Sequence, residues 1–492
     1  MKTEWRFDKM YKIKTLKIYA IACVAIVLGC ISSCHKDKGN YEIDMPIEPE
    51  VTGLDTLYRA IVGDSLIITP HITGISSEHL ECDWRLYVPE EIFPEHNRYE
   101  GNDLRIVFGL QAKRYRARLT VTNTQNGMKY FHNFFIQGVT EFSQGSLVLS
   151  EEAGIAKLSF IRPDSTVQPN VYEAINNEQL PNDPLHIHYL RNMNSGGLPL
   201  AYWVITKNGG VRLNVNDLQK ETTKPGTLHD NFFLPPEVIE VGSLKNHLQG
   251  VLMGTINGKL YGGTTTTWDQ NDLYGMFGAY AVGNYMLAPQ FILTTISNNV
   301  SMIAYEKDKG QFVRLAVQAG PVYFGTQYAV DNTIDAFDPH AVGLDLVQIV
   351  QINSADTYAY MRDADGQVYE LKFTAAFHTN PFTFRPLHKR LFARQEWMHA
   401  DTKLVATKTG YIYIAAGNKI YRYNPLNEQI LELEASLTSP VTMLKLDDDE
   451  NTLLAGSGNS VYYLDIQVGQ NGNIQGKIEG IPGQPVDMVW RK

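Results

Sequence analysis

The sequence predicts an all-β protein in which a small β-sandwich is followed by a β-propeller, with seven blades favoured over six or eight. Three observations predict this fold: a hairpin of period-two alternation near residue 120, glycine turns that recur through residues 145–492, and a C-terminal segment that repeats an earlier one. The length of 492 residues excludes one compact small domain. A hydrophobic content of 44% and 53 aromatic residues indicate a folded chain.

Residues 46–140 contain short runs typical of strands, and we expect them to form the sandwich. The clearest run alternates apolar and polar side chains, and Asn126-Gly127 then turns the chain into a returning strand. Trp84 is the expected core aromatic, and Cys82 on the same strand face is expected to be a buried small hydrophobe. The alternating positions are Tyr115, Ala117, Leu119 and Val121 against Arg116, Arg118 and Thr120.

Residues 145–492 contain seven glycine turns between β-rich runs, with successive glycines 41 to 56 residues apart. This spacing suits four-stranded propeller blades. The turns are Ala153-Gly154, Asn208-Gly209, Asn257-Gly258, Lys309-Gly310, Asp365-Gly366, Gly417-Asn418 and Gly458-Asn459. Every turn after the first follows an apolar strand, expected near Ile187, Val241, Phe291, Val347, Trp397 and Val441.

The missing strand for the first turn is expected at the C-terminus. Residues 485–489 (PVDMV) repeat residues 440–444 (PVTML), so a last inner strand ends at Trp490. We expect that strand to pair with the blade that opens at Ser146. Such pairing closes a propeller ring and removes exposed edges.

The N-terminal 33 residues read as a lipoprotein signal peptide. Basic residues precede 14 apolar ones, too few to span a bilayer core, and Ile31-Ser32-Ser33-Cys34 then matches the lipobox of bacterial lipoproteins. We expect lipid on Cys34 and a polar tether over residues 34–45, so that the protein is held on a membrane. A lipobox at Cys30, a start at Met10 and an uncleaved anchor are the alternatives.

The net charge limits the classes of binding partner, and the cysteine content limits the possible disulfide bonds. The formal charge is −10, and without the first 33 residues it becomes −14 from 37 basic and 51 acidic residues. Such a chain is repelled by phosphate backbones, so no nucleic-acid partner is expected. Cys82 is the one cysteine after Cys34, so the mature chain has none to pair it with.

The whole chain resembles the PKD-like lipoproteins of Bacteroidetes. The resemblance rests on Cys34 with the trailing HKDKGNY, the hairpin from Tyr115 to Phe135, and the junction from Gln144 to Ile161. It implies a PKD/Ig-like sandwich and an outer-membrane location, with the bulk of the protein facing the cell surface. It also implies an association with SusC/SusD-type importers of glycans or oligopeptides. No family active site is carried over.

The sequence gives only weak evidence for catalytic or metal-binding motifs. Neither a Gly-x-Ser-x-Gly elbow nor a His-Glu-x-x-His pair occurs in the sequence. His399 and Asp401 would share one face if a strand continued there, which would allow an acid/base pair. Acidic clusters at Asp447–Glu450 and Asp331–His340 are interpreted as solvated loops. We therefore expect no cofactor, no metal and no catalytic residue.

Aromatic residues in two loops are the candidate ligand contacts. If both loops converge on one rim of the channel, their rings would suit sugars or peptide side chains. Packing between blades is the alternative. The candidates are Trp268, Tyr274, Phe277, Tyr280 and Tyr285 in the first loop, and Tyr323 and Tyr328 in the second.

The leading functional hypothesis is a non-catalytic surface lipoprotein that binds or positions glycans or oligopeptides for a SusC/SusD-type importer. A structural interaction scaffold in the envelope is the second hypothesis. A hydrolase or lyase that acts on surface polymers is the third.

Overall fold

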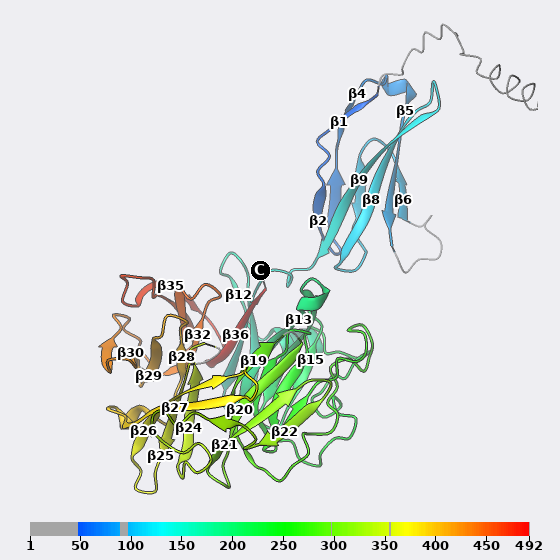
Figure 1. The fold of residues 1–492 in the computed structure, drawn as a ribbon. Coiled ribbons are helices and arrows are strands. Elements are labelled where there is room, and N and C mark those ends of the chain that lie inside the picture. The colour runs from blue at the N-terminus through cyan, green and yellow to red at the C-terminus, as the bar shows by residue number, and fades with distance from the viewer. Residues whose placement is uncertain (1–47, 89–96, 297, 354–355, 492) are drawn as a thin grey trace, which may run out of the picture.

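A computed structural model describes residues 48–88, 97–296, 298–353 and 356–491, and Figure 1 shows its fold. The regular structure in these ranges is almost entirely β-strand, which confirms the all-β class. The helices of the described residues are short: α2 (Val171–Asn176), η1 (Ser77–His79), η3 (Met193–Ser195) and η4 (Gln395–Trp397).

The first nine strands form a sandwich that stands beside the rest of the chain in Figure 1. Its main sheet has the order β2-β9-β8-β5-β6, with β2 parallel to β9 and the other pairs antiparallel. Two short pairs, β1 with β4 and β3 with β7, complete it. The strands are β1 (Glu50–Thr52), β2 (Leu57–Ile61), β3 (Ser65–Ile68), β4 (His71–Thr73), β5 (Leu80–Tyr87), β6 (Arg98–Glu100), β7 (Leu104–Val107), β8 (Arg114–Asn123) and β9 (Met128–Val139).

The predicted hairpin is present as β8 and β9, with Tyr115 opposite Ile136. The apolar positions of β8 are buried and face the core, as the alternation predicted. Trp84 is fully buried, and its Nε1 donates a hydrogen bond to Gly101 O at 2.8 Å. Cys82 is also buried beside it, as expected.

Seven further sheets contain the remaining described strands. The first sheet has the order β36-β10-β11-β12, and the next two have three strands each. Their strands are β36 (Gln484–Arg491), β10 (Gly145–Glu152), β11 (Ile155–Ile161) and β12 (Val167–Gln168); then β13 (Pro184–Asn192), β14 (Leu198–Thr206) and β15 (Gly209–Leu213); then β16 (Val241–Asn246), β17 (Leu252–Ile256) and β18 (Lys259–Gly262).

The fourth to seventh sheets have four or five strands each. The fourth contains β19 (Leu287–Ile296), β20 (Asn299–Glu306), β21 (Gln311–Val317) and β22 (Pro321–Gly325). The fifth contains β24 (Asp345–Gln351), β25 (Asp356–Arg362), β26 (Val368–Ala376), β27 (Thr383–Leu391) and β23 (Ala329–Val330). The sixth contains β28 (Leu404–Ala406), β29 (Ile412–Ala416), β30 (Lys419–Asn424) and β31 (Gln429–Glu432), and the seventh β32 (Val441–Leu446), β33 (Thr452–Ser457), β34 (Ser460–Asp465) and β35 (Asn473–Glu479).

The seven sheets follow one another around a ring. The inner strand of each sheet contacts that of the next, in the order β36, β13, β16, β19, β24, β28, β32 and back to β36. All seven predicted glycine turns join the second strand of a sheet to the third. At one of them Asn257 and Gly258 both have positive φ (52° and 67°), as a tight hairpin turn requires. The arrangement is propeller-like.

The C-terminal strand closes the ring as predicted. β36 pairs antiparallel with β10, with Ser146 opposite Trp490 and Val148 opposite Met488. Polar side chains then tie neighbouring inner strands together across the sheet boundaries. Examples are the bonds from Asn246 Nδ2 to Tyr189 O (3.1 Å), Lys245 Nζ to Phe291 O (2.9 Å), Gln290 Nε2 to Gln348 Oε1 (2.8 Å) and Thr442 Oγ1 to Pro485 O (2.7 Å).

The predicted position of one inner strand is wrong. Trp397 lies in the helix η4, and β28 begins later, at Leu404. The Thr402 hydroxyl donates to Trp397 O (2.6 Å) and accepts from His399 N (2.9 Å), which holds the segment in a turn. The strand therefore does not continue through His399 and Asp401, and the geometry proposed for that acid/base pair is absent.

Candidate functional site

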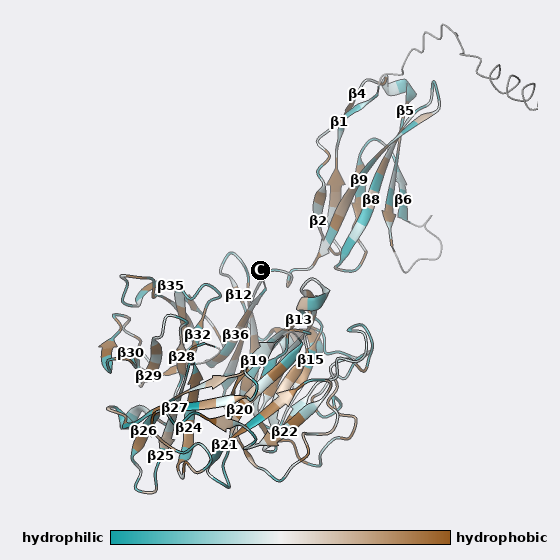
Figure 2. Ribbon diagram, viewed as in Figure 1, coloured by the Kyte–Doolittle hydropathy of each residue, from teal (hydrophilic) through white to brown (hydrophobic). Residues whose placement is uncertain are grey.

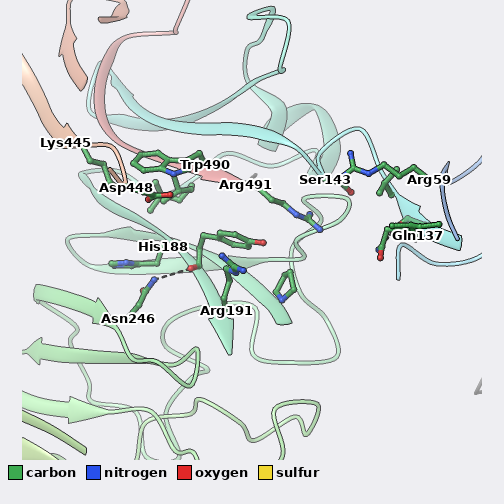
Figure 3. Close-up of a pocket in the computed structure, with 17 residues that line it drawn as sticks. Arg59, Gln137, Ser143, His188, Arg191, Asn246, Lys445, Asp448, Trp490 and Arg491 are labelled. Atoms are coloured by element: carbon green, nitrogen blue, oxygen red, sulfur yellow. Dashed lines mark hydrogen bonds between the residues drawn. The ribbon is translucent and has the colours of Figure 1, made fainter. Parts of the chain in front are cut away.

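A cavity of about 680 Å³ lies between the sandwich and the ring (Figure 3). From the ring it is lined by residues along β13, by Pro199 at the start of β14, and by residues at or just beyond the carboxyl ends of the inner strands β16, β32 and β36. From the sandwich it is lined by the end of β9 and by β2. The site thus combines segments from both ends of the chain.

Cationic side chains dominate the polar lining. Arg59, Arg191, Lys445 and Arg491 contribute four positive charges, and among the lining residues Asp448 is the one carboxylate. This balance is opposite in sign to the net charge of −10 for the whole chain. Because low-dielectric walls focus such a field, the cavity favours an anionic or strongly hydrogen-bonding ligand.

Backbone and amide contacts hold two of these guanidinium groups in place. Arg491 Nη1 donates to Val215 O (2.5 Å), and its Nη2 donates to Asn216 Oδ1 (3.3 Å). Arg191 Nε donates to Gly197 O at 3.1 Å. A guanidinium carries five donors, so these contacts do not use every N–H group of either side chain. These cations are therefore oriented before a ligand arrives.

Aromatic rings supply the apolar part of the site. Tyr189 on β13 is stacked on Tyr202, with centroids 4.9 Å apart. Trp490 on β36 lies below the Lys445 ammonium, 5.8 Å from the ring centroid. Both rings are only partly buried, so they offer apolar faces beside oriented donors.

A partly buried cluster of titratable side chains lies at the same rim. Burial alone would raise the pKa of Asp487, but Lys445 and His186 outweigh that effect and lower it. Burial, the largest cause, and the neighbouring His186 together lower the pKa of His188 to about 3, against the opposing effect of Asp487. His188 is therefore neutral near pH 7, and its buried Nε2 has no hydrogen-bond partner in the described part of the chain.

The first aromatic loop does not form the predicted rim. The third sheet lacks a fourth strand, and residues 263–281 run along the outer edge of β18 instead, with Gly263 bridged to Phe277 and Ala281 N bonded to Leu260 O. Tyr274, Phe277 and Tyr285 are consequently buried. Internal packing, the alternative for these rings, is what the structure shows for these three residues.

The four other candidate ligand contacts differ in their exposure to solvent. Trp268 is 84% exposed and Tyr280 is 43% exposed, whereas Tyr323 is half-buried and stacked on Tyr285 at 4.2 Å. Tyr328 is half-buried, and its hydroxyl donates to Phe312 O (2.7 Å). None of the seven candidates lines the cavity.

The lining residues that sequence reasoning missed come from distant parts of the chain. The sequence indicates Trp490 only as the end of the closing strand, and Arg191 and Lys445 belong to no motif. The one usable signal was the predicted closure itself, which places the end of β36 beside the inner strands on either side.

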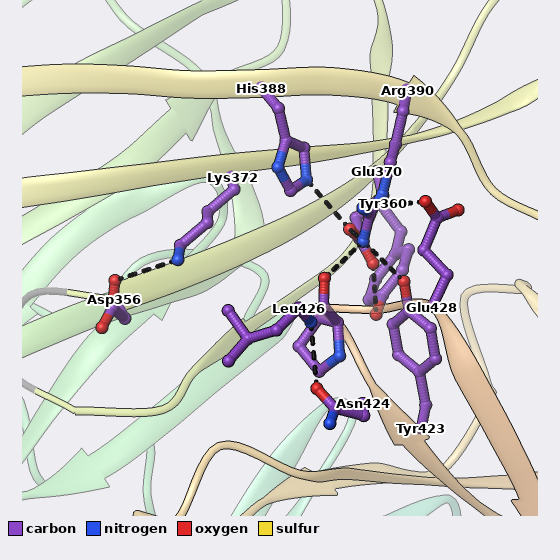
Figure 4. Close-up of polar contacts among 11 residues, drawn as sticks. Asp356, Tyr360, Glu370, Lys372, His388, Arg390, Tyr423, Asn424, Leu426 and Glu428 are labelled. Atoms are coloured by element: carbon purple, nitrogen blue, oxygen red, sulfur yellow. Dashed lines mark hydrogen bonds and ion pairs between the residues drawn. The ribbon is translucent and has the colours of Figure 1, made fainter.

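A second polar cluster lies between the fifth and sixth sheets (Figure 4). The fully buried Glu370 accepts from Arg390 Nη2 (2.6 Å) and lies 3.0 Å from His388 Nε2. Arg390 also bonds the Tyr423 hydroxyl (2.9 Å) and pairs with Glu428 (3.1 Å). Because its members bind one another across two sheets, the cluster acts as a structural latch.

Acidic side chains of the loop Asp331–His340 are likewise engaged by other groups of the protein. Asp331 is paired with Arg385, and Asp338 accepts from His340 N at 2.9 Å. Within the described ranges no group of three or more His, Cys, Asp or Glu side chains is placed to hold a metal ion.

No helix in those ranges is long and apolar enough to cross a bilayer. Cys34 lies outside the described residues, so its lipidation stays a prediction.

Comparison with known proteins finds a similarity to a protein family over part of the chain. Residues 34–184 match the model of the PKD-like family, which covers the sandwich and the first strands of the ring. A quinonprotein alcohol dehydrogenase-like protein from Bacteroides thetaiotaomicron is similar at 11% identity and a TM-score of 0.38, over 90% of this chain and 99% of that one. The GH74 enzyme of Niastella koreensis is similar at 10% identity and a TM-score of 0.29, over 76% and 65%. No curated protein matches the sequence.

Proposed function

We propose that this protein is a non-catalytic, lipid-anchored protein of the outer-membrane surface that captures glycans at the cavity between its sandwich and its ring. We further propose that the ring is a seven-bladed β-propeller and that the captured glycan is passed to a SusC/SusD-type importer. The cavity carries the proposal, because it combines partly exposed aromatic faces with fixed cationic donors.

The size and chemistry of the cavity support binding of a small sugar chain. About 680 Å³ lies within the usual range of roughly 300–1,000 Å³ for ligand sites. Tyr189 and Trp490 offer ring faces for the apolar side of a sugar, while Arg191 and Arg491 offer donors for its oxygens.

The same lining argues for binding rather than hydrolysis. A glycosidase places two carboxylates on either side of the bond that it cleaves. Asp448 is the one carboxylate among the described lining residues, and Asp487 behind the rim is engaged by Lys445 at 2.7 Å. The cavity therefore lacks the pair that the commonest mechanism requires.

The proposals of a lipid anchor and of an importer as partner are supported by the sequence. The lipobox at Cys34 supports attachment to a membrane, and the resemblance to PKD-like lipoproteins supports the importer. The match of residues 34–184 to the PKD-like family supports the first half of that resemblance.

The test is retention on a panel of immobilised neutral and acidic glycans and of oligopeptides. Trp490→Ala and Arg191→Gln should each weaken glycan retention at least about fivefold in protein that remains folded at the assay temperature. Trp268→Ala, which removes a ring outside the cavity, is the matched control. Retention of oligopeptides alone would replace the ligand class, and turnover of a glycan would overturn the non-catalytic assignment.

A second candidate function, docking on other envelope proteins, is favoured by one observation. The outer loops of the second and third sheets expose large apolar side chains, with Leu234, Trp268 and Val282 each more than four-fifths accessible. Co-purification with transporter subunits that persists in Trp490→Ala but is lost on replacing these three side chains would favour this scaffold role.

A further inference from the structure

The solvent face of the main sandwich sheet carries a row of arginines. Along β8, Arg114, Arg116 and Arg118 point away from the core, opposite the buried Tyr115, Ala117, Leu119 and Val121. The alternation can be followed in Figure 2. No ion pair joins any of the three arginines to a carboxylate in the described part of the chain. Like charges on one strand face repel one another, so this row lowers the stability of the sheet unless a counter-charge binds.

Aromatic rings on the neighbouring strand fix two of these guanidinium groups. The Arg114 guanidinium lies 4.0 Å from the Phe135 ring centroid, and that of Arg118 lies 4.9 Å from Phe131. Stacking orients the planar group while leaving its N–H donors free for a second partner. Arg118 Nε is buried without a hydrogen-bond partner among the described residues. Such groups match the two oxygens of a carboxylate or sulfate.

The arginine row continues into the cavity. Arg114 is directly opposite Gln137 on β9, and Gln137 is in turn opposite Arg59 on β2. Both Gln137 and Arg59 line the cavity, where Figure 3 shows them on the side facing the ring. From Arg118 to Arg114 the strand covers about 14 Å, and the cationic lining of the ring rim follows.

We propose that this arginine face and the cavity form one continuous binding surface for an acidic polysaccharide, whose carboxylate or sulfate groups pair with the arginines of β8 while one end occupies the cavity. This inference rests on the proposed function, since it names the class of glycan. Continuity with the cavity favours an extended soluble polymer over an anionic membrane surface, which would contact the face but could not enter the cavity.

The test compares dextran sulfate with dextran, which share one backbone and differ in charge, and adds polygalacturonate as a carboxylate polymer. Arg114→Gln/Arg116→Gln/Arg118→Gln should weaken binding of both polyanions at least about tenfold and reduce the salt dependence of binding. Arg105→Gln/Lys408→Gln/Lys419→Gln, which removes three charges elsewhere, should change it less than about twofold.

Two further variants keep the test decisive. Replacing the three arginines by lysine keeps the charge but loses paired donors, so binding should fall to an intermediate level. If the triple glutamine variant does not fold, Arg116→Gln alone, at an exposed position, should still weaken binding about threefold.

Three results would overturn the inference. These are unchanged polyanion binding in the arginine variants, equal affinity of the parent protein for dextran and dextran sulfate, and binding to phosphatidylglycerol vesicles without binding to either polyanion. If neutral glycans are retained through Trp490 while the arginine variants behave as the parent, the inference is wrong and the proposed function stands. If no glycan of any kind is retained, both are wrong.

Discussion

Asp487 and Lys445 join the last strand of the chain to the sheet beside it, with Lys445 Nζ 2.7 Å from Asp487 Oδ1. The other oxygen of the same carboxylate accepts from Ile187 N at 3.0 Å. One side chain therefore ties β32, β36 and β13 together, which belong to three successive sheets of the ring. It does so at the point where the ring closes and directly behind the proposed binding cavity.

Replacing this carboxylate should weaken the whole ring. Asp487→Ala leaves the Lys445 ammonium and the Ile187 amide without their partner in a largely buried place, so we expect a loss of about 3 kcal/mol in the free energy of unfolding. Glu432→Gln, which breaks the exposed pair with Lys419, should cost no more than about 0.5 kcal/mol. Denaturant unfolding measures both. Equal losses in the two variants would contradict the role of Asp487 as a closure residue.

Stability should fall as the solution becomes acidic, with His188 as one cause. The pKa of His188 is lowered from its ordinary value of 6.5 to about 3 in the folded protein. Burial is the main cause, His186 and Lys445 act in the same direction, and Asp487 acts in the opposite direction. The unfolded chain then binds more protons at every pH between these values, so stability rises with pH across this window. We expect a slope of roughly 1 kcal/mol per pH unit from this residue at pH 4–6.

His188→Gln removes that contribution. The variant should show a flatter dependence of the unfolding free energy on pH between 4 and 6, while its value near pH 7.5 changes little more than the lost packing requires. Resonances of the His188 ring should also stay constant between pH 5 and 8. A titration of this ring near pH 6.5 would show that it is solvated and not buried in neutral form.

The latch at Glu370 should be more sensitive than its exposed counterpart. Glu370 and Glu428 both pair with Arg390, but the side chain of Glu370 is fully buried and that of Glu428 is 49% exposed. Glu370→Gln weakens the bonds to Arg390 and His388 and should cost about 2–4 kcal/mol. Glu428→Gln should cost about 0.5 kcal/mol or less. Thermal unfolding of the pair distinguishes a latch from a surface charge cluster.

The aromatic loop should matter for stability. Phe277 is fully buried against Phe232 and Tyr261, with centroids 5.0 and 6.0 Å away, so Phe277→Ala should cost about 3–5 kcal/mol. Trp268→Ala should stay within about 0.5 kcal/mol because the side chain is 84% exposed. Equal losses would show that the loop does not pack on β18 as described.

Local patterns predicted most of the fold. Period-two alternation identified β8, and glycine positions located all seven hairpins, because a tight turn restricts which residues can occupy it. The repeat of residues 440–444 in residues 485–489 located β36. The prediction for Trp397 is wrong because its ring stacks on that of Tyr421, with ring centroids 4.2 Å apart. In the sequence, an apolar residue packed in this way cannot be distinguished from one in a strand.

The candidate site could not be predicted in the same way. Its residues are brought together only by ring closure and by the position of the sandwich, so Arg59, Arg191 and Trp490 form no pattern along the chain. The prediction for the aromatic loop is wrong for a related reason. Nothing local in the sequence showed that the third sheet would lack a fourth strand and need that loop to cover its edge.

The thiol of Cys82 should be unreactive in the folded protein. Burial in the sandwich core raises its pKa to about 11, so only about one thousandth of the side chain is thiolate at pH 8. Reagents must also reach a side chain that is 6% exposed. In the variant Cys34→Ala, produced without the signal peptide, a thiol-specific reagent should label less than one tenth of the protein over an hour at about pH 8 and all of it in denaturant. Rapid labelling under native conditions would show that the sandwich opens, because no other cysteine follows residue 34.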